Sequence, residues 1–307
     1  MRLAYPQGVN LHLTPVLFVL FGLCPLDPLF PSAFADPAAP LQIVAAENFY
    51  GGVAAQIASP NAEVKSILTN PNQDPHEFTT SAATARLVAD ADIVIYNGID
   101  YDPWMDRLLA TSGKPNRVVI KVADLIGAKD GDNPHIWYDP KTMLALAARL
   151  SVELTKRSPE HLTFFEDRSA RFLYSMQPVL DKIAEIKSHY AGQPVTATEP
   201  VFGYMADALG FKMLNYDFQL RIMNDTEPTA DQTAAFEKSL ATKTARILFY
   251  NSQVTDPTTD RLQNLARQSG IPVVGVTETQ PPGAISYVDW MLSELHDVQS
   301  ALAVKNP

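Results

Sequence analysis

Residues 42–68 read QIVAAENFYGGVAAQIASPNAEVKSIL and show the pattern that decides the fold. Two short apolar runs, at 42–46 and 63–68, have the length and composition of buried strands. Between them, residues 50–58 have the composition of a helix. A strand, a helix and a second strand in so few residues predict two parallel strands joined by a helix.

The same alternation continues through two halves of the chain. In the first half we predict further strands at 92–96 and 117–121, and helices at 81–89, 103–110 and 141–156. In the second half we predict strands at 194–198, 212–216, 245–250 and 271–276, and helices at 202–208, 230–240, 258–268 and 286–304. The predicted fold is therefore α/β with two lobes, each a parallel sheet with flanking helices.

The stretch between the two halves, 159–190, has apolar residues at helical spacing and little glycine or serine. This composition predicts a long rigid connector helix, which Pro178 is expected to kink or divide. The predicted domains are an N-terminal lobe at 36–158, the connector at 159–190 and a C-terminal lobe at 191–307. A length of 307 residues fits two such lobes.

The first segment, 1–35, has the features of a signal peptide. An apolar run at 16–23 is too short to span a membrane, and the small-x-small triplet ending at Ala35 is typical of a cleavage site. Cys24 is the one cysteine of the chain, and Leu23 precedes it where a lipoprotein would have a small residue. We therefore predict a periplasmic protein, cleaved near Ala35 and without a lipid anchor at Cys24.

Composition excludes several kinds of protein. The chain has 24 Lys and Arg against 34 Asp and Glu, a net charge of -10, so it lacks the basic footprint of a nucleic-acid binder. A single cysteine excludes a cysteine-rich zinc site and an intrachain disulfide. The acidic balance is compatible with a cationic ligand.

Four ligand-type side chains follow predicted strands, two in each half: His76, His135, Glu199 and Glu278. Ligands of open parallel sheets bind beyond the carboxyl ends of the strands, so these four side chains could converge between the lobes. Imidazole nitrogen together with carboxylate oxygen suits borderline divalent ions such as manganese, zinc or Fe(II). Each residue taken alone is also compatible with an ordinary loop or helix-terminus position.

Two other functions compete with metal binding. The first is a metal-dependent hydrolase, because His76 and Glu77 begin like a metalloprotease motif. Thr80 stands where the second histidine of that motif would be, which speaks against this function. The second is a receptor for a small organic solute, in which His76 and His135 only line the cleft. No Walker A motif is present, so any ATPase must be another chain.

Four segments carry a resemblance to a known family: DPHEF at 74–78, NPHIWYDP at 133–140, TEPVFGY at 198–204 and GVTET at 275–279. In this order and spacing they resemble the ligand segments of bacterial zinc and manganese substrate-binding proteins. Those proteins are the periplasmic or lipid-anchored receptors of metal ABC importers. The similarity extends over nearly all of 41–303.

The resemblance implies two α/β lobes joined by a rigid helix, with one divalent ion held between them by His76, His135, Glu199 and Glu278. It also implies delivery of the ion to a membrane permease of an ABC importer with its separate ATPase, and no catalysis; we expect a monomer. Glu199 stands where many members have histidine, which favours manganese, whereas zinc also binds such sites well. Glu278 stands where members usually have aspartate.

Overall fold

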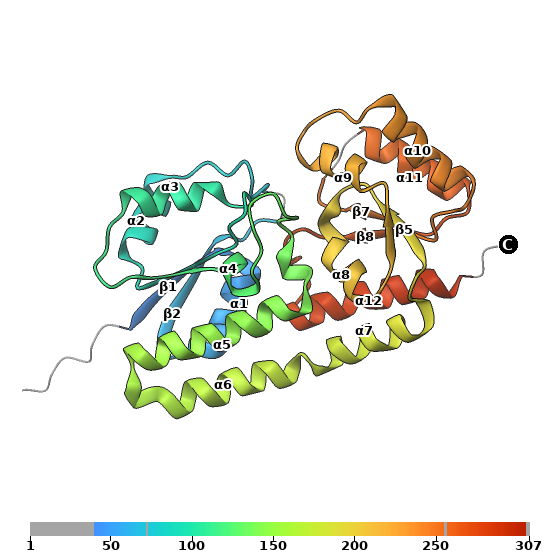
Figure 1. Cartoon of the computed structure of the whole chain (residues 1–307). Helices are drawn as coiled ribbons and strands as arrows, with labels where there is room; N and C mark the ends of the chain where they lie inside the picture. Colours follow the sequence, from blue (N-terminus) through green and yellow to red (C-terminus); the bar gives the residue numbers. More distant parts are fainter. Residues whose placement is uncertain (1–39, 72, 255–256, 305–307) are drawn as a thin grey trace, which may run out of the picture. The chain divides into compact units, whose positions relative to one another are not determined.

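The computed structural model describes residues 40–71, 73–254 and 257–304, so the predicted signal peptide and Cys24 lie outside the described residues. Two parallel four-stranded sheets form its framework (Figure 1). The first has the order β2-β1-β3-β4, with β1 (Leu41–Glu47), β2 (Ala62–Leu68), β3 (Ile93–Tyr96) and β4 (Val118–Lys121). The second has the order β6-β5-β7-β8, with β5 (Pro194–Ala197), β6 (Lys212–Leu214), β7 (Leu248–Asn251) and β8 (Val273–Val276). The predicted fold class is confirmed.

Helices cover both faces of the first sheet. They are α1 (Asn48–Ala58), α2 (Ala82–Asp90), α3 (Pro103–Thr111), α4 (Val122–Ile126), the short 3-10 helix η1 (Ile136–Tyr138) and α5 (Pro140–Arg157). Alternate residues of β1 serve different faces: Ile43 and Ala45 belong to one apolar cluster, and Val44 and Ala46 to another. A strand buried on both faces reads as a continuous apolar run, which is why this stretch was recognisable in the sequence.

The second sheet is flanked in the same way. Its helices are η3 (Pro200–Phe202), α8 (Gly203–Ala208), α9 (Tyr216–Met223), α10 (Ala230–Ala241), α11 (Pro257–Gln268) and α12 (Tyr287–Ala303). The strand predicted at 212–216 is shorter in the structure, because Asn215 adopts a left-handed conformation with φ of 57° and α9 follows it. Asparagine tolerates this conformation better than most residues.

The connector consists of two long helices rather than one. A short 3-10 turn, η2 (Pro159–His161), leads into α6 (Leu162–Ser175), and α7 (Gln177–Tyr190) begins after Met176. Pro178 lies in the first turn of α7, where proline is tolerated, so the break occurs where the sequence predicted a kink or division. Helix α6 packs against α1 and α5 of the first lobe, whereas α7 packs against α12 of the second. No helix in the described residues is both long and apolar enough to cross a membrane.

An aromatic cluster joins the two lobes. The ring centroid of Phe49 in α1 lies 4.9 Å from that of Trp137 and 5.9 Å from that of Trp290 in α12. The Tyr287 hydroxyl donates to the Trp137 carbonyl (2.6 Å). Both sheets belong to one compact unit, Pro40–Pro307, and a large apolar contact of this kind opposes wide hinge motion. The division at 158 and 190 stays a prediction.

Candidate metal centre

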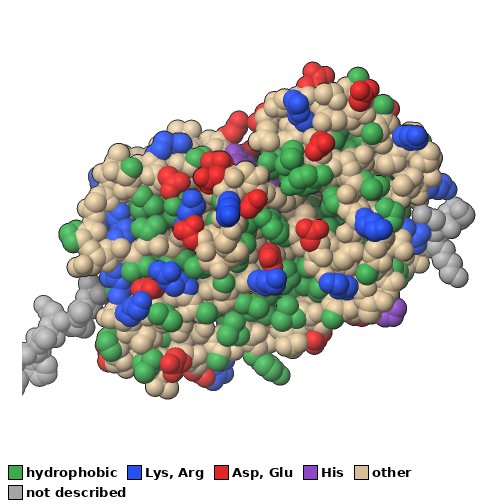
Figure 2. Space-filling model, viewed as in Figure 1, with side chains coloured by type: hydrophobic (Ala, Val, Ile, Leu, Met, Phe, Trp, Pro, Cys, Tyr) green, Lys and Arg blue, Asp and Glu red, His purple; other side chains and the backbone are tan. Residues whose placement is uncertain are grey.

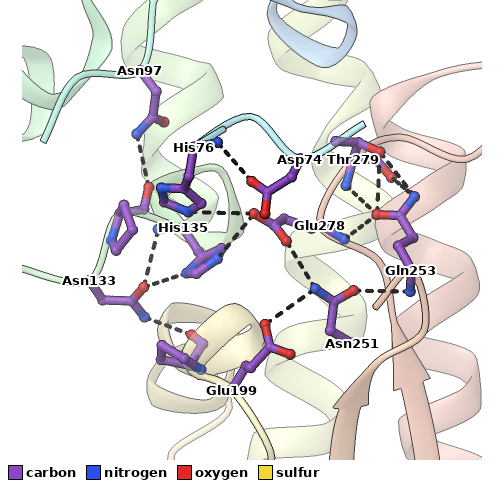
Figure 3. Close-up of polar contacts among 12 residues, drawn as sticks. Asp74, His76, Asn97, Asn133, His135, Glu199, Asn251, Gln253, Glu278 and Thr279 are labelled. Atoms are coloured by element: carbon purple, nitrogen blue, oxygen red, sulfur yellow. Dashed lines mark hydrogen bonds and ion pairs between the residues drawn. The ribbon is translucent and has the colours of Figure 1, made fainter. Parts of the chain in front are cut away.

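All four predicted site residues lie beyond the carboxyl ends of strands and line one cavity of about 350 Å³ (Figure 3). His76 lies in the loop after β2, and His135 immediately precedes η1. Glu199 lies between β5 and the start of η3, and Glu278 follows β8. Each lobe therefore contributes two side chains, as predicted for parallel sheets.

Three of these side chains converge closely. Glu278 Oε1 lies 3.8 Å from His76 Nε2 and 3.7 Å from His135 Nε2, and one ligand atom of each residue lies within 4.8 Å of the others. Bonds from zinc to nitrogen or oxygen are about 2.0–2.2 Å long, so two ligand atoms on one ion lie at most about 4.4 Å apart. A closing movement of a few tenths of an ångström therefore brings all three onto one ion.

Glu199 stands beside this group rather than within it. Its Oε2 lies 3.4 Å from Asn251 Nδ2, and the same nitrogen donates to Glu278 Oε2 at 2.9 Å. The structure thus places Asn251, the last residue of β7, between the two carboxylates (Figure 3). The predicted fourth ligand is connected to the other three through this amide.

The hydrogen bond of the His76 ring fixes its tautomer. Nδ1 lies 3.1 Å from the Asp100 carbonyl oxygen, which can only accept, so Nδ1 carries the proton. Nε2 is then unprotonated in the neutral ring and directs its lone pair towards Glu278. Ligand histidines usually have their other ring nitrogen held in this way.

A side chain holds the His135 ring in the same tautomer as the His76 ring. Its Nδ1 lies 2.7 Å from Asn133 Oδ1, and Asn133 Nδ2 donates to the Pro200 carbonyl at 2.7 Å. Because the amide nitrogen is engaged with a carbonyl, the oxygen must face the ring, so Nδ1 is again the donor. His135 Nε2 therefore also presents a lone pair towards Glu278. Burial lowers the pKa of His135, although Glu278 opposes the shift, so the ring is neutral at neutral pH.

The third of these side chains, Glu278, is held in its charged form. Burial raises its pKa, but His135, His76 and the Asn251 amide more than offset that, and the pKa of Glu278 lies below its ordinary value. Its Oε1 is buried and has no hydrogen-bond donor among the described residues. Glu278 Oε1 and the Nε2 atoms of His76 and His135 thus face one point. This donor set fits a divalent transition-metal ion.

The turn between β3 and α3 supports both histidines. Both carboxylate oxygens of Asp102 accept backbone N–H groups, from Asn97 at 2.7 Å and from Gly98 at 2.8 Å. This holds Asp100 in a left-handed conformation, with φ of 62°, so that its carbonyl reaches His76. The Asn97 side chain donates to the Pro134 carbonyl (2.9 Å), next to His135. One buried turn therefore contacts both histidine-bearing loops of the first lobe.

Replacing Asp102 with alanine should lower the free energy of unfolding by about 2 kcal/mol, because it leaves two buried N–H groups without acceptors. It should also weaken zinc binding, since the Asp100 carbonyl is no longer held against His76. Urea denaturation and a zinc competition titration measure the two effects. Asp297→Ala, an exposed aspartate of α12, is the control and should change stability by less than about 0.5 kcal/mol. Unchanged stability and affinity in Asp102→Ala would contradict the supporting role of the turn.

Further acidic side chains line the cavity. Asp74, Asp225 and Glu227 line it together with the four predicted residues. Figure 2 shows acidic side chains beside a visible histidine surface where the upper ends of the two lobes meet. Acidic groups that line a cavity raise the local concentration of cations.

Sequence reasoning did not single out Asn97, Asn251 or Tyr101 as site residues. The Tyr101 ring is buried against both histidines, with centroids 5.0 Å from His76 and 6.0 Å from His135. Asn251 directly follows the strand predicted at 245–250, so the rule that found Glu199 would have found it as well. An amide is not a usual transition-metal ligand, so its residue type alone does not mark Asn251 as a candidate.

Comparison with known proteins gives a consistent result. The model of a family described as zinc-uptake complex component A, periplasmic, matches residues 43–301. The manganese-binding lipoprotein MntA of Halalkalibacterium halodurans is 22% identical over 277 residues, which cover 86% of this chain and 89% of the relative. The iron ABC transporter substrate-binding lipoprotein MtsA of Streptococcus pyogenes serotype M1 is 24% identical over 287 residues, with the same coverage. The solved structure of the periplasmic zinc-binding protein TroA from Treponema pallidum has a TM-score of 0.73 at 17% identity, covering 87% of this chain and 100% of that one. This last likeness shows a shared fold.

Proposed function

This chain belongs to the ZnuA family of periplasmic zinc-uptake components, and on that basis we propose that it binds one divalent transition-metal ion and delivers it to an importer. The ion is manganese or zinc, or alternatively Fe(II). The metal is the cargo of the protein rather than a resident cofactor. Relatives named for manganese and iron support this range of ions.

One observation supports the proposal more than any other: Glu278 Oε1 is buried without a hydrogen-bond donor and faces the Nε2 atoms of His76 and His135. Oxygen and nitrogen lone pairs placed together in a buried site repel one another unless a cation lies among them. The proposed ligands are therefore His76, His135 and Glu278, with Glu199 as the fourth.

The proposed shell has two imidazoles and two carboxylates. This shell is harder than one of three histidines, which favours manganese, while the general order of affinities favours zinc. Both metals therefore belong in the test. A buried four-residue shell also leaves less room for a catalytic water, in keeping with a protein that is not an enzyme.

Equilibrium dialysis of the purified chain against Zn(II) and Mn(II), followed by metal analysis, tests the proposal. We expect one equivalent of bound metal, and bound metal should raise the thermal unfolding temperature because it binds only the folded state. Failure to bind either ion would contradict the proposal. Hydrolytic activity of the metal-loaded chain would favour the alternative of a metal-dependent hydrolase, and binding of a small organic solute in place of metal would favour the receptor alternative.

The proposed partners are a membrane permease and its separate ATPase, since a relative is named as an ABC transporter substrate-binding lipoprotein. We propose that the chain acts as a monomer in the periplasm after cleavage near Ala35. Both named relatives are lipoproteins, but Leu23 before Cys24 speaks against acylation here. Mass spectrometry of the exported protein tests this point, because a chain that begins at acylated Cys24 would contradict it.

A further inference from the structure

Asn251 is a buried amide at the carboxyl end of β7, with 3% of its surface exposed. Its Oδ1 accepts the backbone N–H of Gln253 at 3.1 Å, which fixes the orientation of the amide. Its Nδ2 must therefore face the cavity, where it lies 2.9 Å from Glu278 Oε2 and 3.4 Å from Glu199 Oε2 (Figure 3). An NH₂ group has two hydrogens, one for each carboxylate.

The two carboxylates share this donor. Glu199 and Glu278 are both buried, with 9% and 8% of their surfaces exposed, so their negative charges repel across a poorly solvated gap. The Asn251 amide attracts both and holds them at the same edge of the cavity. It also engages Glu278 Oε2, so that Oε1 is the oxygen directed towards the histidines.

The imidazole side of the site has a matching amide. Asn133 orients the His135 ring through its Oδ1 and reaches the second lobe through Pro200. Asn133 thus acts on a nitrogen ligand, whereas Asn251 acts only on oxygen ligands. Asn133 therefore orients the softer, nitrogen donor of the site, and Asn251 orients the harder, oxygen donors.

We propose that Asn251 is a positioning residue that sets how much carboxylate oxygen the bound ion receives, and with it the preference between manganese and zinc. This inference rests on the proposed function. Manganese depends on oxygen donors and on a larger shell, which needs Glu199 held beside Glu278. Zinc is satisfied by four ligands, and imidazole nitrogen suits it well. Loss of the amide should therefore weaken manganese binding more than zinc binding.

The test compares Zn(II) and Mn(II) dissociation constants for the unaltered chain, Asn251→Ala and Asn133→Ala. Substitutions in the groups that orient ligands typically change affinity by about 10–100-fold. We expect Asn251→Ala to weaken manganese binding by at least about tenfold and zinc binding by no more than about threefold. Asn133→Ala should weaken zinc binding at least as much as manganese binding. Asn251→Thr, which keeps one donor, should give an intermediate ratio and serves if the alanine variant does not fold.

The electron paramagnetic resonance spectrum of bound Mn(II) is a second readout, because it reports the symmetry of the shell and should differ between Asn251→Ala and the unaltered chain. General destabilisation would weaken the binding of both metals equally. An unchanged ratio of the Mn(II) and Zn(II) dissociation constants in Asn251→Ala and Asn251→Thr would therefore overturn the inference while leaving the proposed function intact. Binding of neither metal by the unaltered chain would overturn the proposed function and this inference with it.

Discussion

Replacing His135 with alanine should weaken the binding of both Zn(II) and Mn(II) by at least about 100-fold, beyond the ~10–100-fold effect of residues that only orient ligands. His135 is fully buried, its ring is held by Asn133, and its Nε2 lies 3.7 Å from Glu278 Oε1. The substitution removes a nitrogen donor, and burial lowers the pKa of His135, which reduces the competition of protons with a metal ion at this nitrogen. Competition titration with a chelator of known affinity measures the change.

His296 offers a control, because it is an exposed histidine of α12. His296→Ala should leave both affinities within about twofold of those of the unaltered chain, since it is an exposed side chain outside the cavity. The comparison separates loss of a ligand from loss of any imidazole. If His135→Ala bound both ions as tightly as the unaltered chain, the assignment of this residue as a ligand would be wrong.

The architecture was predictable from the sequence because its signals are local. Continuous apolar runs such as 42–46 mark strands buried on both faces, and Pro178 marked the division of the connector. Asn215 shows the limit: one residue in a left-handed conformation ended β6 and started α9 within what read as a single strand. That choice depends on tertiary contacts, since the Asn215 amide donates to Thr196 and Ser239 in other elements.

The site was predictable only as a set of candidates. The rule that ligands follow the carboxyl ends of parallel strands selected His76, His135, Glu199 and Glu278, and the structure brings three of them together. Their role as metal ligands stays a prediction. The sequence could not show that Asn251 lies between the two glutamates, because that depends on distances between loops far apart in the chain and on the orientation of one amide.

A second buried network of hydrogen bonds connects Tyr138 of the first lobe with Thr277 and Glu294 of the second. In α12, Glu294 Oε1 accepts from the Thr277 backbone N–H (3.0 Å), the Thr277 hydroxyl (3.2 Å) and Trp290 Nε1 (2.9 Å). Its Oε2 lies 2.7 Å from the Tyr138 hydroxyl, which also lies 2.7 Å from the Thr277 carbonyl oxygen. Tyr138 has one hydroxyl proton and two acceptors. Both contacts are hydrogen bonds only if Glu294 carries a proton and donates it to Tyr138.

The pKa of Glu294 agrees with this count of protons. Burial raises it from 4.5 to about 7, although the hydrogen bonds that Thr277 and Trp290 donate to the carboxyl group oppose the shift. Between about pH 4.5 and 7 the unfolded chain releases this proton while the folded chain keeps it, so the folded state loses stability as the pH rises. Above pH 7 this loss in the free energy of unfolding is complete and amounts to about 3 kcal/mol.

Glu294→Gln should therefore be more stable than the unaltered chain by about 2–3 kcal/mol at pH 8, but by less than about 1 kcal/mol at pH 5. Glutamine keeps an oxygen for the donors of Thr277 and Trp290, and its amide nitrogen supplies the permanent donor that Tyr138 needs. Urea denaturation at pH 5 and pH 8, in the presence of a chelator so that metal binding does not contribute, measures the difference.

Glu153→Gln in α5 is a control of opposite sign. Burial raises the pKa of Glu153, but Lys156 and Arg149 more than offset this and lower it, so its charge stabilises the folded state at pH 8 and this contribution is lost as the pH falls. Glu153→Gln should thus lower stability at pH 8, where Glu294→Gln raises it. A stability difference for Glu294→Gln that is the same at pH 5 and pH 8 would show that Glu294 is not a protonated acid in the folded chain, because only a titrating group makes the difference depend on pH.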